Sequence, residues 1–309
     1  MRFAVVGDAT LDVTVAPDLP SRAAGDVPAT IRLGPGGQGA NVAVRLARSG
    51  AAVTLVSAMA DDAAGRLLRE ALLAEHVAVA PVATARSSIV LALLDADGER
   101  TMFSDRRGLD PPAVAAALAD ATWIHCSGYA LLDDESGDAL AEVLAARTAE
   151  QRLSVAGGSL AVEPGRVERF ARRLRIARPQ LLVLSLDEAA ALAGNPPGSR
   201  VAAVASRLGG FADVAVATDG SRGSSAAISA QLVEVAAPGL PGPALDSTGS
   251  GDAYAAAMIA TLARGEWPPG RDELEGAMQR ASELGAQVAR VVGAQGRVAA
   301  ERGPTRVQR

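Results

Sequence analysis

The sequence has no lysine, so all 30 of its basic side chains are arginines. This absence excludes a lysine nucleophile, a Schiff base and the phosphate-binding lysine of a P-loop. The single cysteine, Cys126, excludes a disulfide within the chain and a cysteine zinc cluster, and its apolar run TWIHCSG predicts a buried thiol. The only histidines are His76 and His125, and neither accompanies a G-x-S-x-G motif, so a Ser-His-Asp hydrolase is not indicated.

Excess positive charge and long apolar runs are also missing. The formal net charge is −5, which argues against a nucleic-acid surface built on charge. No apolar run approaches the roughly 20 residues of a spanning helix, and MRFAVVGD reaches an acidic residue too early for a signal peptide. We therefore expect a cytoplasmic protein that binds neither nucleic acid nor membranes.

Short apolar runs alternate with longer segments of helical period. Six runs read as strands buried on both faces, as in a parallel sheet: 3–7, 53–57, 122–127, 153–157, 181–185 and 213–218. Four segments between them carry apolar residues at three- and four-residue spacing: 40–50, 63–75, 136–150 and 199–210. The pattern predicts a three-layer α/β fold with a doubly wound, mostly parallel sheet.

Two stretches, 9–33 and 87–105, instead alternate apolar and polar residues around turn signals. The second contains DADGER (95–100), which predicts an Asp-Gly hairpin. We expect them to form a small sheet within a single domain, 1–309, as a lid made of about 9–35 and 86–106. Alternatively, the sheet is an oligomer surface, and one sheet can serve both roles. A small sheet with one apolar face has little stability by itself, which suggests a homodimer through the lid.

The stretch LGPGGQGANVAV (33–44) has two interpretations. Gly34, Gly36 and Gly39 form a G-x-G-x-x-G, typical of a dinucleotide-binding turn, with a ribose-binding acid at Asp61 or Asp62. Alternatively, Gly36 and Gly37 with Asn41 form a G-G-x-x-x-N that holds a sugar. The preceding PATIRL reads as a lid strand, and Pro35 stiffens the turn, so the second interpretation is favoured.

The stretch DSTGSGD (246–252) leads into an alanine-rich helix. Its glycines leave backbone N–H groups uncovered, and a helix start adds its own free donors and partial positive charge. The result is a cradle for a phosphoryl group, with Asp252 placed to take a proton from an attacking hydroxyl. The alternative is that Asp252 is only a helix N-cap.

DSTGSGDAYAA resembles the D-T-x-G-A-G-D signature of the ribokinase-like (PfkB) family of sugar and nucleoside kinases, and GPGGQGANVAVRLARSGA resembles its G-G-x-G-A-N signature. The resemblance extends from about residue 3 to 296. It implies an ATP- and Mg²⁺-dependent kinase that phosphorylates a primary hydroxyl of a sugar or ribosyl compound. Ribose or a nucleoside such as pseudouridine is the favoured acceptor.

The resemblance also implies roles for individual residues. The catalytic group consists of the base Asp252 and the anion hole Gly249, Ser250 and Gly251. The sugar-binding group consists of Asp12, Gly36, Gly37 and Asn41, and the ATP-binding group of Thr218, Gly220 and Gly223. Glu188 matches a residue that organises Mg²⁺ through water. Asp246, with the backbone near 292–294, falls where many members hold a monovalent cation such as K⁺.

The sequence departs from the family pattern at several places. Ser185 replaces the Asn of an N-x-x-E motif, VAGGSLAVEP replaces a D-x-N motif, and Gln38 stands where ribokinases have a lysine. The first two of these differences favour, as an alternative, a catalytically weak relative that binds a ligand or regulates. Arg106 and Arg107 are candidates for a second phosphate or a solvated pair, and Tyr129 for substrate contact or packing.

Aromatic residues make up only 3% of the sequence, and Phe103 is the only one in the two lid stretches. No platform for stacking a nucleobase is therefore evident from the sequence.

Overall fold

The computed structural model describes residues 1–18, 25–95, 100–160, 163, 165–229, 231–239, 242 and 244–298. Nine strands within these residues form one main sheet, parallel except at the edge made by β12 and β13. In their order across the sheet, the strands are β13 (Gln231–Val235), β12 (Ser224–Ile228), β11 (Val214–Thr218), β10 (Leu181–Ser185), β9 (Arg152–Ala156), β8 (Trp123–Cys126), β1 (Arg2–Val6), β4 (Ala52–Ala58) and β5 (Ala78–Val82).

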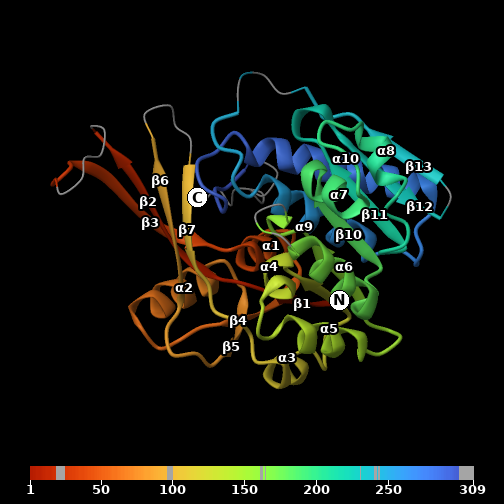
Figure 1. The fold of residues 1–309 in the computed structure, drawn as a ribbon. Coiled ribbons are helices and arrows are strands. Elements are labelled where there is room, and N and C mark those ends of the chain that lie inside the picture. The colour runs from red at the N-terminus through yellow and green to blue at the C-terminus, as the bar shows by residue number, and fades with distance from the viewer. Residues whose placement is uncertain are drawn as a thin grey trace, which may run out of the picture.

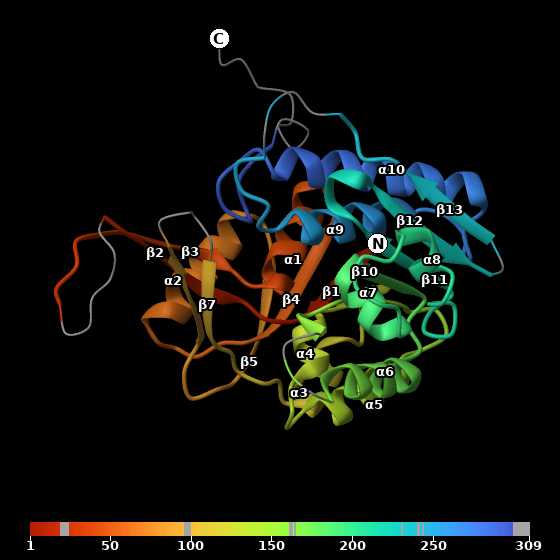
Figure 2. The same ribbon diagram turned by 45° about the horizontal axis from the view of Figure 1, so that its top comes forward.

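Helices cover both faces of the main sheet, which gives three layers (Figure 1). One face packs against α1 (Gln38–Arg48), α2 (Ala63–Ala74), α9 (Ser250–Leu262) and α10 (Arg271–Val288). The other face packs against α3 (Pro111–Ala117), α4 (Gly128–Leu132), α5 (Gly137–Ala145), α6 (Arg166–Ala177), α7 (Leu186–Ala193) and α8 (Val201–Ala205). Figure 2 shows α9 and α10 on one side of the sheet and α3, α5 and α6 on the other. None of the helices among the described residues has the length and hydropathy that a membrane span requires.

The predicted fold class is confirmed, and the six predicted strands correspond to β1, β4, β8, β9, β10 and β11. Their side chains are almost all buried because the sheet is covered on both faces, which is why the strands read as continuous apolar runs. Cys126 on β8 is fully buried and free, as predicted. The predicted helix at 199–210 is shorter in the structure, where α8 ends at Ala205.

Four strands form a second, small sheet beside the main one (Figure 1). In order they are β3 (Ala29–Gly36), β2 (Thr10–Pro17), β6 (Ser88–Leu94) and β7 (Arg100–Asp105). Strand β2 pairs in parallel with β6, and the two outer pairs are antiparallel. The turn of the predicted Asp-Gly hairpin, residues 96–99, lies outside the described residues.

The small sheet has two chemically different faces. The register places one set of apolar side chains on the same face of all four strands: Leu11, Val13, Val15, Ile31, Leu33, Ile89, Leu91, Leu93 and Phe103. We call this the outer face; Ile31, Leu33 and Phe103 there are 62%, 63% and 57% exposed. The opposite, inner face carries Asp12 and Ser104, and Ser104 lines a cavity against α4.

Candidate active site

The start of α1 packs against the end of β1 so closely that glycine is required. Gly37 has a φ of +95°, and a Cβ there would lie 2.5 Å from the carbonyl oxygen of Asp8. A Cβ at Gly39 would lie 2.8 Å from the carbonyl carbon of Gly7. The N–H of Ala40 donates to the Asp8 carbonyl at 3.0 Å. The glycines therefore bring the first turn of α1 to the carboxyl end of β1.

The dinucleotide interpretation of this stretch is wrong. Gly34 and Gly36 lie in β3 of the small sheet, so the motif does not join a parallel strand to its helix as a dinucleotide turn must. Asp62, a candidate for binding ribose, is instead the N-cap of α2: its oxygens accept from the N–H of Gly65 at 2.7 Å and of Ser87 at 2.8 Å.

Asn41 joins the two glycine motifs of the sequence. Its Nδ2 donates to Oδ2 of Asp252 at 2.8 Å. Its Oδ1 accepts a hydrogen bond from Nε2 of Gln295 at 3.1 Å, which fixes the orientation of the amide. The predicted base and a predicted sugar-binding residue therefore lie at one place, between the N-terminal turns of α1 and α9.

The surroundings of Asp252 raise the pKa of its carboxyl group from the ordinary 3.8 to about 7. Burial is the largest cause, and the negative charges of Asp8 and Glu188 add to it. The hydrogen bond from Asn41 and the charge of Arg45 act in the opposite direction. A carboxylate with a pKa near neutrality suits a general base.

Asp252 is not the N-cap of α9, so that alternative is wrong. The N-cap is Gly249, which has a φ of +79° and no capping side chain, and Asp252 is the third helical residue. A Cβ at Gly249 would lie 2.7 Å from Cα of Ala294. In the first turn, the N–H of Ser250 donates to the Ser247 carbonyl at 3.1 Å, whereas that of Gly251 has no acceptor within the helix, as a predicted anion-hole donor requires.

Asp12 lies on β2 with its carboxylate against the backbone of β3. A Cβ at Gly36 would lie 2.0 Å from Oδ2 of Asp12, so the glycine makes room for this carboxylate. The hydroxyl of Thr10 donates to Oδ1 of Asp12 at 2.6 Å, and burial raises the pKa of the group. The structure thus brings Asp12 to Gly36, beside Gly37 and the start of α1.

The predicted ATP-binding residues gather in one cavity of about 470 Å³. Its lining includes Thr218, Gly220, Gly223, Ser250 and Gly251, together with Tyr254 and small residues of α10. Gly223 has a φ of +110° and approaches β13 too closely for a side chain, since its Cβ would lie 2.2 Å from the Val235 carbonyl oxygen. The cavity therefore joins the predicted nucleotide-binding and anion-binding segments.

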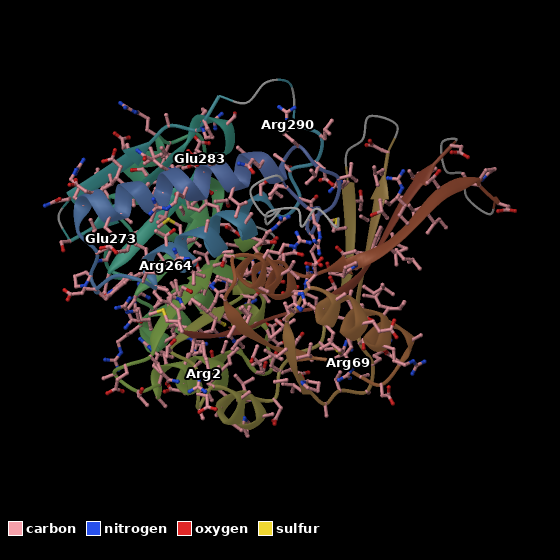
Figure 3. The ribbon with its side chains drawn as sticks, turned by 180° about the vertical axis from the view of Figure 1, so that it is seen from behind. Arg2, Arg69, Arg264, Glu273, Glu283 and Arg290 are labelled. Carbon is pink, nitrogen blue, oxygen red and sulfur yellow. The ribbon has the colours of Figure 1, made fainter. Side chains whose placement is uncertain are left out.

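Two further residues of this cavity were not predicted from the sequence. The hydroxyl of Tyr254 is 2.9 Å from that of Ser224 in a buried pair. Arg290 follows α10 and lies on the side that faces the small sheet (Figure 3). Residues two apart on a helix lie on different faces, so the spacing of Tyr254 and Asp252 gave no signal for Tyr254.

Ser185 forms the N-cap of α7 in a capping box with Glu188. Oε2 of Glu188 accepts from the N–H and the hydroxyl of Ser185 at 3.0 and 2.9 Å, and its Oε1 accepts from the N–H of Ser159 at 2.9 Å. Gly157 makes room for the carboxylate, since a Cβ there would lie 2.1 Å from Oε2. Serine therefore holds Glu188 in place at the position where the family pattern has Asn.

Asp246 is fully engaged by hydrogen-bond donors. Its Oδ1 accepts from the N–H of Thr248 and from Nη2 of Arg100, each at 3.0 Å, and its Oδ2 accepts from the N–H of Gly293 at 2.9 Å. Arg100 also donates to the hydroxyl of Thr248. Burial favours a higher pKa for Asp246, but these donors outweigh it and hold the pKa below its usual value. Sequence analysis missed Arg100, because nothing in its neighbourhood indicates a contact with residue 246.

Asp8 is a second residue that sequence analysis missed. Its Oδ2 accepts from Nε of Arg106 at 3.0 Å, and its Oδ1 accepts from the hydroxyl of Ser127 at 3.1 Å. The Arg106 guanidinium stacks 4.1 Å from the centroid of the Tyr129 ring. Arg106 is therefore not a solvated residue. The place of Asp8 directly after a parallel strand is the signal that could have identified it.

Gln38 connects three segments where ribokinases have a lysine. Its Oε1 accepts from the hydroxyl of Ser127 at 2.7 Å and the N–H of Gly128 at 2.9 Å, and its Nε2 donates to the Gly157 carbonyl at 2.9 Å. An ammonium group could not accept two of these three bonds. The amide therefore has a structural role in this chain.

Residues 293–296 contact several parts of the site at once. Gly293 binds Asp246 and Gln295 binds Asn41, as described above. The carbonyls of Ala294 and Gly296 accept from Arg45 at 2.7 and 2.9 Å. This segment, which we call the closing loop, thus fixes α1 to α9.

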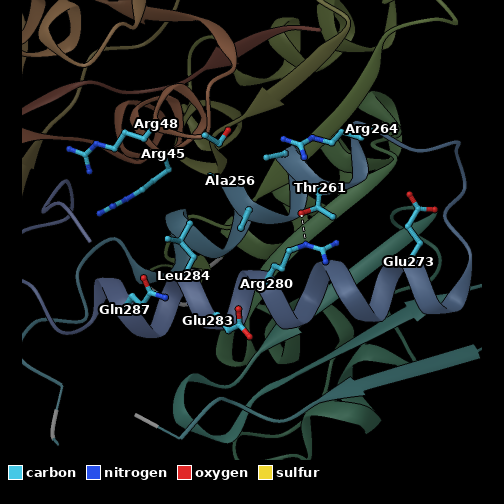
Figure 4. Close-up of a pocket in the computed structure, with 13 residues that line it drawn as sticks. Arg45, Arg48, Ala256, Thr261, Arg264, Glu273, Arg280, Glu283, Leu284 and Gln287 are labelled. Atoms are coloured by element: carbon cyan, nitrogen blue, oxygen red, sulfur yellow. Dashed lines mark hydrogen bonds between the residues drawn. The ribbon is translucent and has the colours of Figure 1, made fainter. Parts of the chain in front are cut away.

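A separate groove of about 670 Å³ lies between α1, α9 and α10 (Figure 4). It is lined by arginines and by small residues of α9, and Arg264, Glu273 and Glu283 lie on this side of the molecule (Figure 3). Arg280 donates to the hydroxyl of Thr261 at 3.3 Å, and Arg48 pairs with Glu75 at 2.9 Å. The groove contains none of the predicted site residues.

Comparisons with known proteins agree with this architecture. The sequence profile described as "pfkB family carbohydrate kinase" matches residues 2–300. A fructokinase of Klebsiella pneumoniae is 31% identical over 246 residues, which are 74% of this chain and 77% of that protein.

Two solved structures share the fold. A ribokinase from Thermotoga maritima has a TM-score of 0.78 at 18% identity, with 97% of each chain covered. A double mutant of the fructokinase from Vibrio cholerae, with fructose, ADP and a potassium ion bound, has a TM-score of 0.75 at 20% identity, with 95% of this chain and 94% of that chain covered.

Proposed function

The chain belongs to the pfkB family of carbohydrate kinases, and we propose on this premise that it transfers the γ-phosphoryl group of ATP to a primary hydroxyl of a free furanose sugar. The observation that carries the proposal is the hydrogen bond between Asn41 and Asp252, which joins the sugar-binding motif to the base and the anion cradle. Fructose and ribose are the first candidate acceptors.

Asp252 acts as the general base. Its raised pKa leaves a carboxylate that is basic enough at neutral pH to take the proton of the attacking hydroxyl. The hydrogen bond from Asn41 occupies Oδ2, so the second oxygen, Oδ1, is the one that receives the proton. Asn41 thereby orients the carboxylate as well as contacting the sugar.

The start of α9 stabilises the transferred group. The backbone N–H groups of Gly249 and Gly251 and the positive end of the helix stabilise the charge that grows on the phosphoryl oxygens, and the N–H of Ser250 must leave the Ser247 carbonyl to join them. Thr218, Gly220 and Gly223 line the cavity in which the rest of the nucleotide lies. Its small residues leave space for an adenosine.

Asp12 and Asn41 bind the sugar hydroxyls. A carboxylate accepts two O–H donors, and an amide both donates and accepts, so the pair suits a vicinal diol. Gly36 makes room for the Asp12 carboxylate, and Gly37 lets the start of α1 lie against the backbone of Asp8.

A free sugar is preferred to a nucleoside because the Tyr129 ring in the inner cavity is already stacked with the Arg106 guanidinium, 4.1 Å from its centroid, and the small sheet adds no ring there. Phe103 points to the outer face of the small sheet, whereas its neighbours Met102 and Ser104 line the inner cavity. Within the described residues of the small sheet, the inner face therefore offers no ring on which a base such as that of pseudouridine could stack.

Glu188 suits Mg²⁺ bound through water. Its carboxylate oxygens are hard ligands, and its negative charge acts on Asp252, so the two carboxylates together favour a divalent cation held through water. When bound, Mg²⁺ neutralises charge on the phosphates of ATP. Hydrogen bonds from Ser185 and Ser159 fix the orientation of the Glu188 carboxylate.

Asp246, by contrast with Glu188, is not suited to binding a metal cation, here a monovalent one. Unlike Glu188, which has no arginine among its described hydrogen-bond partners, Asp246 already has the guanidinium of Arg100 at 3.0 Å. A second positive charge at this carboxylate would be repelled by the first.

The small sheet acts as the lid of a single kinase unit that spans 1–309. Its inner face carries Asp12, so closing it over the sugar would exclude water and limit ATP hydrolysis. Its exposed apolar outer face contacts the same face of a second copy, which gives a homodimer.

A panel assay tests this function and its rival, a catalytically weak relative that binds or regulates. ADP release from ATP and Mg²⁺ is measured with fructose, ribose, other sugars and pseudouridine. We expect saturable, acceptor-dependent release with a free sugar. Turnover with no acceptor despite binding of a sugar would favour the rival, and turnover only with nucleosides would contradict the acceptor class.

A further inference from the structure

Arg100 is the one described arginine of the small sheet that hydrogen-bonds to the segment leading into α9. It opens β7, and its two terminal nitrogens donate to Oδ1 of Asp246 and to the hydroxyl of Thr248. Thr248 directly precedes Gly249, the N-cap of α9. One guanidinium therefore connects the predicted lid with the loop that forms the anion hole.

The carboxylate that Arg100 contacts is well enclosed. The Asp246 side chain is 8% exposed, whereas that of Arg100 is 39% exposed. Removing Arg100 would leave a nearly buried carboxylate with backbone donors but no neutralising charge. Among the described contacts of Asp246, Arg100 therefore supplies the positive charge that balances this carboxylate.

We propose that Arg100 is a positioning residue whose guanidinium takes the place of a monovalent metal ion at Asp246, so that the small sheet itself supplies the charge that shapes the anion loop. The fructokinase neighbour from Vibrio cholerae has a potassium ion bound, whereas here an arginine reaches the carboxylate from another sheet. The inference deepens the proposed function and rests on it for the role of the anion loop.

Two consequences distinguish Arg100 from an ordinary surface ion pair. Binding of ADP is independent of potassium in the wild type, because the charge is already present. Replacing Arg100 by methionine keeps the apolar stem but removes the guanidinium nitrogens that contact Asp246 and Thr248, so a potassium ion can take their place and binding becomes dependent on potassium.

The experiment is calorimetric titration of ADP and Mg²⁺ into the full chain in buffers of equal ionic strength. One contains potassium, and the other contains N-methyl-D-glucamine as its only monovalent cation. We expect the wild type to bind equally in both and Arg100→Met to bind about tenfold more weakly without potassium, the effect of one lost charge-assisted hydrogen bond. Potassium restores binding by Arg100→Met, and Arg100→Lys stays close to the wild type without it.

Arg86→Met is the matched control, because Arg86 pairs with Asp105 at 3.4 Å beside the same sheet and both side chains are exposed. It should behave as the wild type in both buffers. Thermal melting without nucleotide gives a second measurement, in which potassium raises the melting temperature of Arg100→Met by about 3 °C and leaves the wild type unchanged.

A wild type whose ADP binding or melting temperature rises with potassium overturns the proposal, as does an Arg100→Met variant that matches the wild type in both buffers. Because melting does not depend on nucleotide, a protein that binds no ADP would contradict the proposed function while the role of Arg100 is still measured.

Discussion

Asn41 and Asp252 are hydrogen-bonded at 2.8 Å although 211 positions separate them in the sequence. One residue belongs to the first turn of α1 and the other to the first turn of α9. Two helices that start at the same edge of the main sheet thus bring an amide and a carboxylate together. The chemistry proposed for this kinase depends on that contact.

Asp252→Asn should lower kcat at least ~10²-fold, the low end for a positioned acid–base group, because an amide cannot take the proton of the attacking hydroxyl. KM for sugar and for ATP should change little, since Asn preserves the size of the side chain. Steady-state kinetics with the best acceptor measures both. Asp272→Asn, in the exposed first turn of α10, is the control; near-normal turnover by Asp252→Asn would refute the assignment of the base.

The pH dependence should show opposite trends in activity and stability. Because kcat/KM reports the free enzyme, it should fall about tenfold per pH unit below about 7, where Asp252 becomes protonated. The raised pKa means that the folded state binds this proton more tightly than the unfolded chain does. Its contribution to stability is therefore complete below pH 3.8, the ordinary value, and is lost as the pH rises through about 7.

Urea unfolding across this pH range measures the second trend. Asp252→Asn should lack the part of the decline in unfolding free energy that this carboxyl causes, while both proteins share the contributions of other groups. Identical pH profiles of stability in the two proteins would mean that the pKa of Asp252 is not raised.

Asp12→Ala should raise KM for the sugar about 10- to 100-fold and leave KM for ATP unchanged, because the carboxylate contacts only the acceptor. Varying each substrate at saturating levels of the other separates the two effects. Asp18→Ala, at the exposed position after β2, controls for loss of charge from the small sheet. An equal rise in both constants would count against a sugar-side position.

Leu33→Glu should dissociate the proposed dimer. Leu33 is 63% exposed on the outer face, and a two-fold interface would bury it twice, so a buried charge there should raise the dimer dissociation constant ~10²-fold or more. Analytical ultracentrifugation measures this constant. Arg32→Glu, one residue away on the opposite face, should leave it unchanged. A wild type that is monomeric at all accessible concentrations would show that the outer face serves another purpose.

The sequence predicted those parts of the molecule that depend on local pattern. Strands such as β8 and β10 are buried on both faces, so their composition alone identified them. The glycines of both motifs were recognisable because close backbone approach leaves no alternative residue, as at Gly37 and Gly249.

Pairings between distant segments were not predictable. Arg100 reaches Asp246, and Arg106 reaches Asp8, only through the relative positions of the two sheets, and neither arginine has a periodic or motif-based signal for its partner. Ser185 looked like a loss from the family pattern, but its hydroxyl caps α7 and holds Glu188, a role that only the local geometry reveals.

The closing loop has a consequence for biosynthesis. Residues 293–296 hold Asn41, Arg45 and Asp246 in place, yet the ribosome makes them after every other segment of the site. A nascent chain without residues 293–296 contains Asp252 and the anion cradle, but it lacks the hydrogen bonds of the closing loop that orient these groups. We therefore expect the site to acquire its full phosphoryl-transfer activity only after synthesis has passed residue 296.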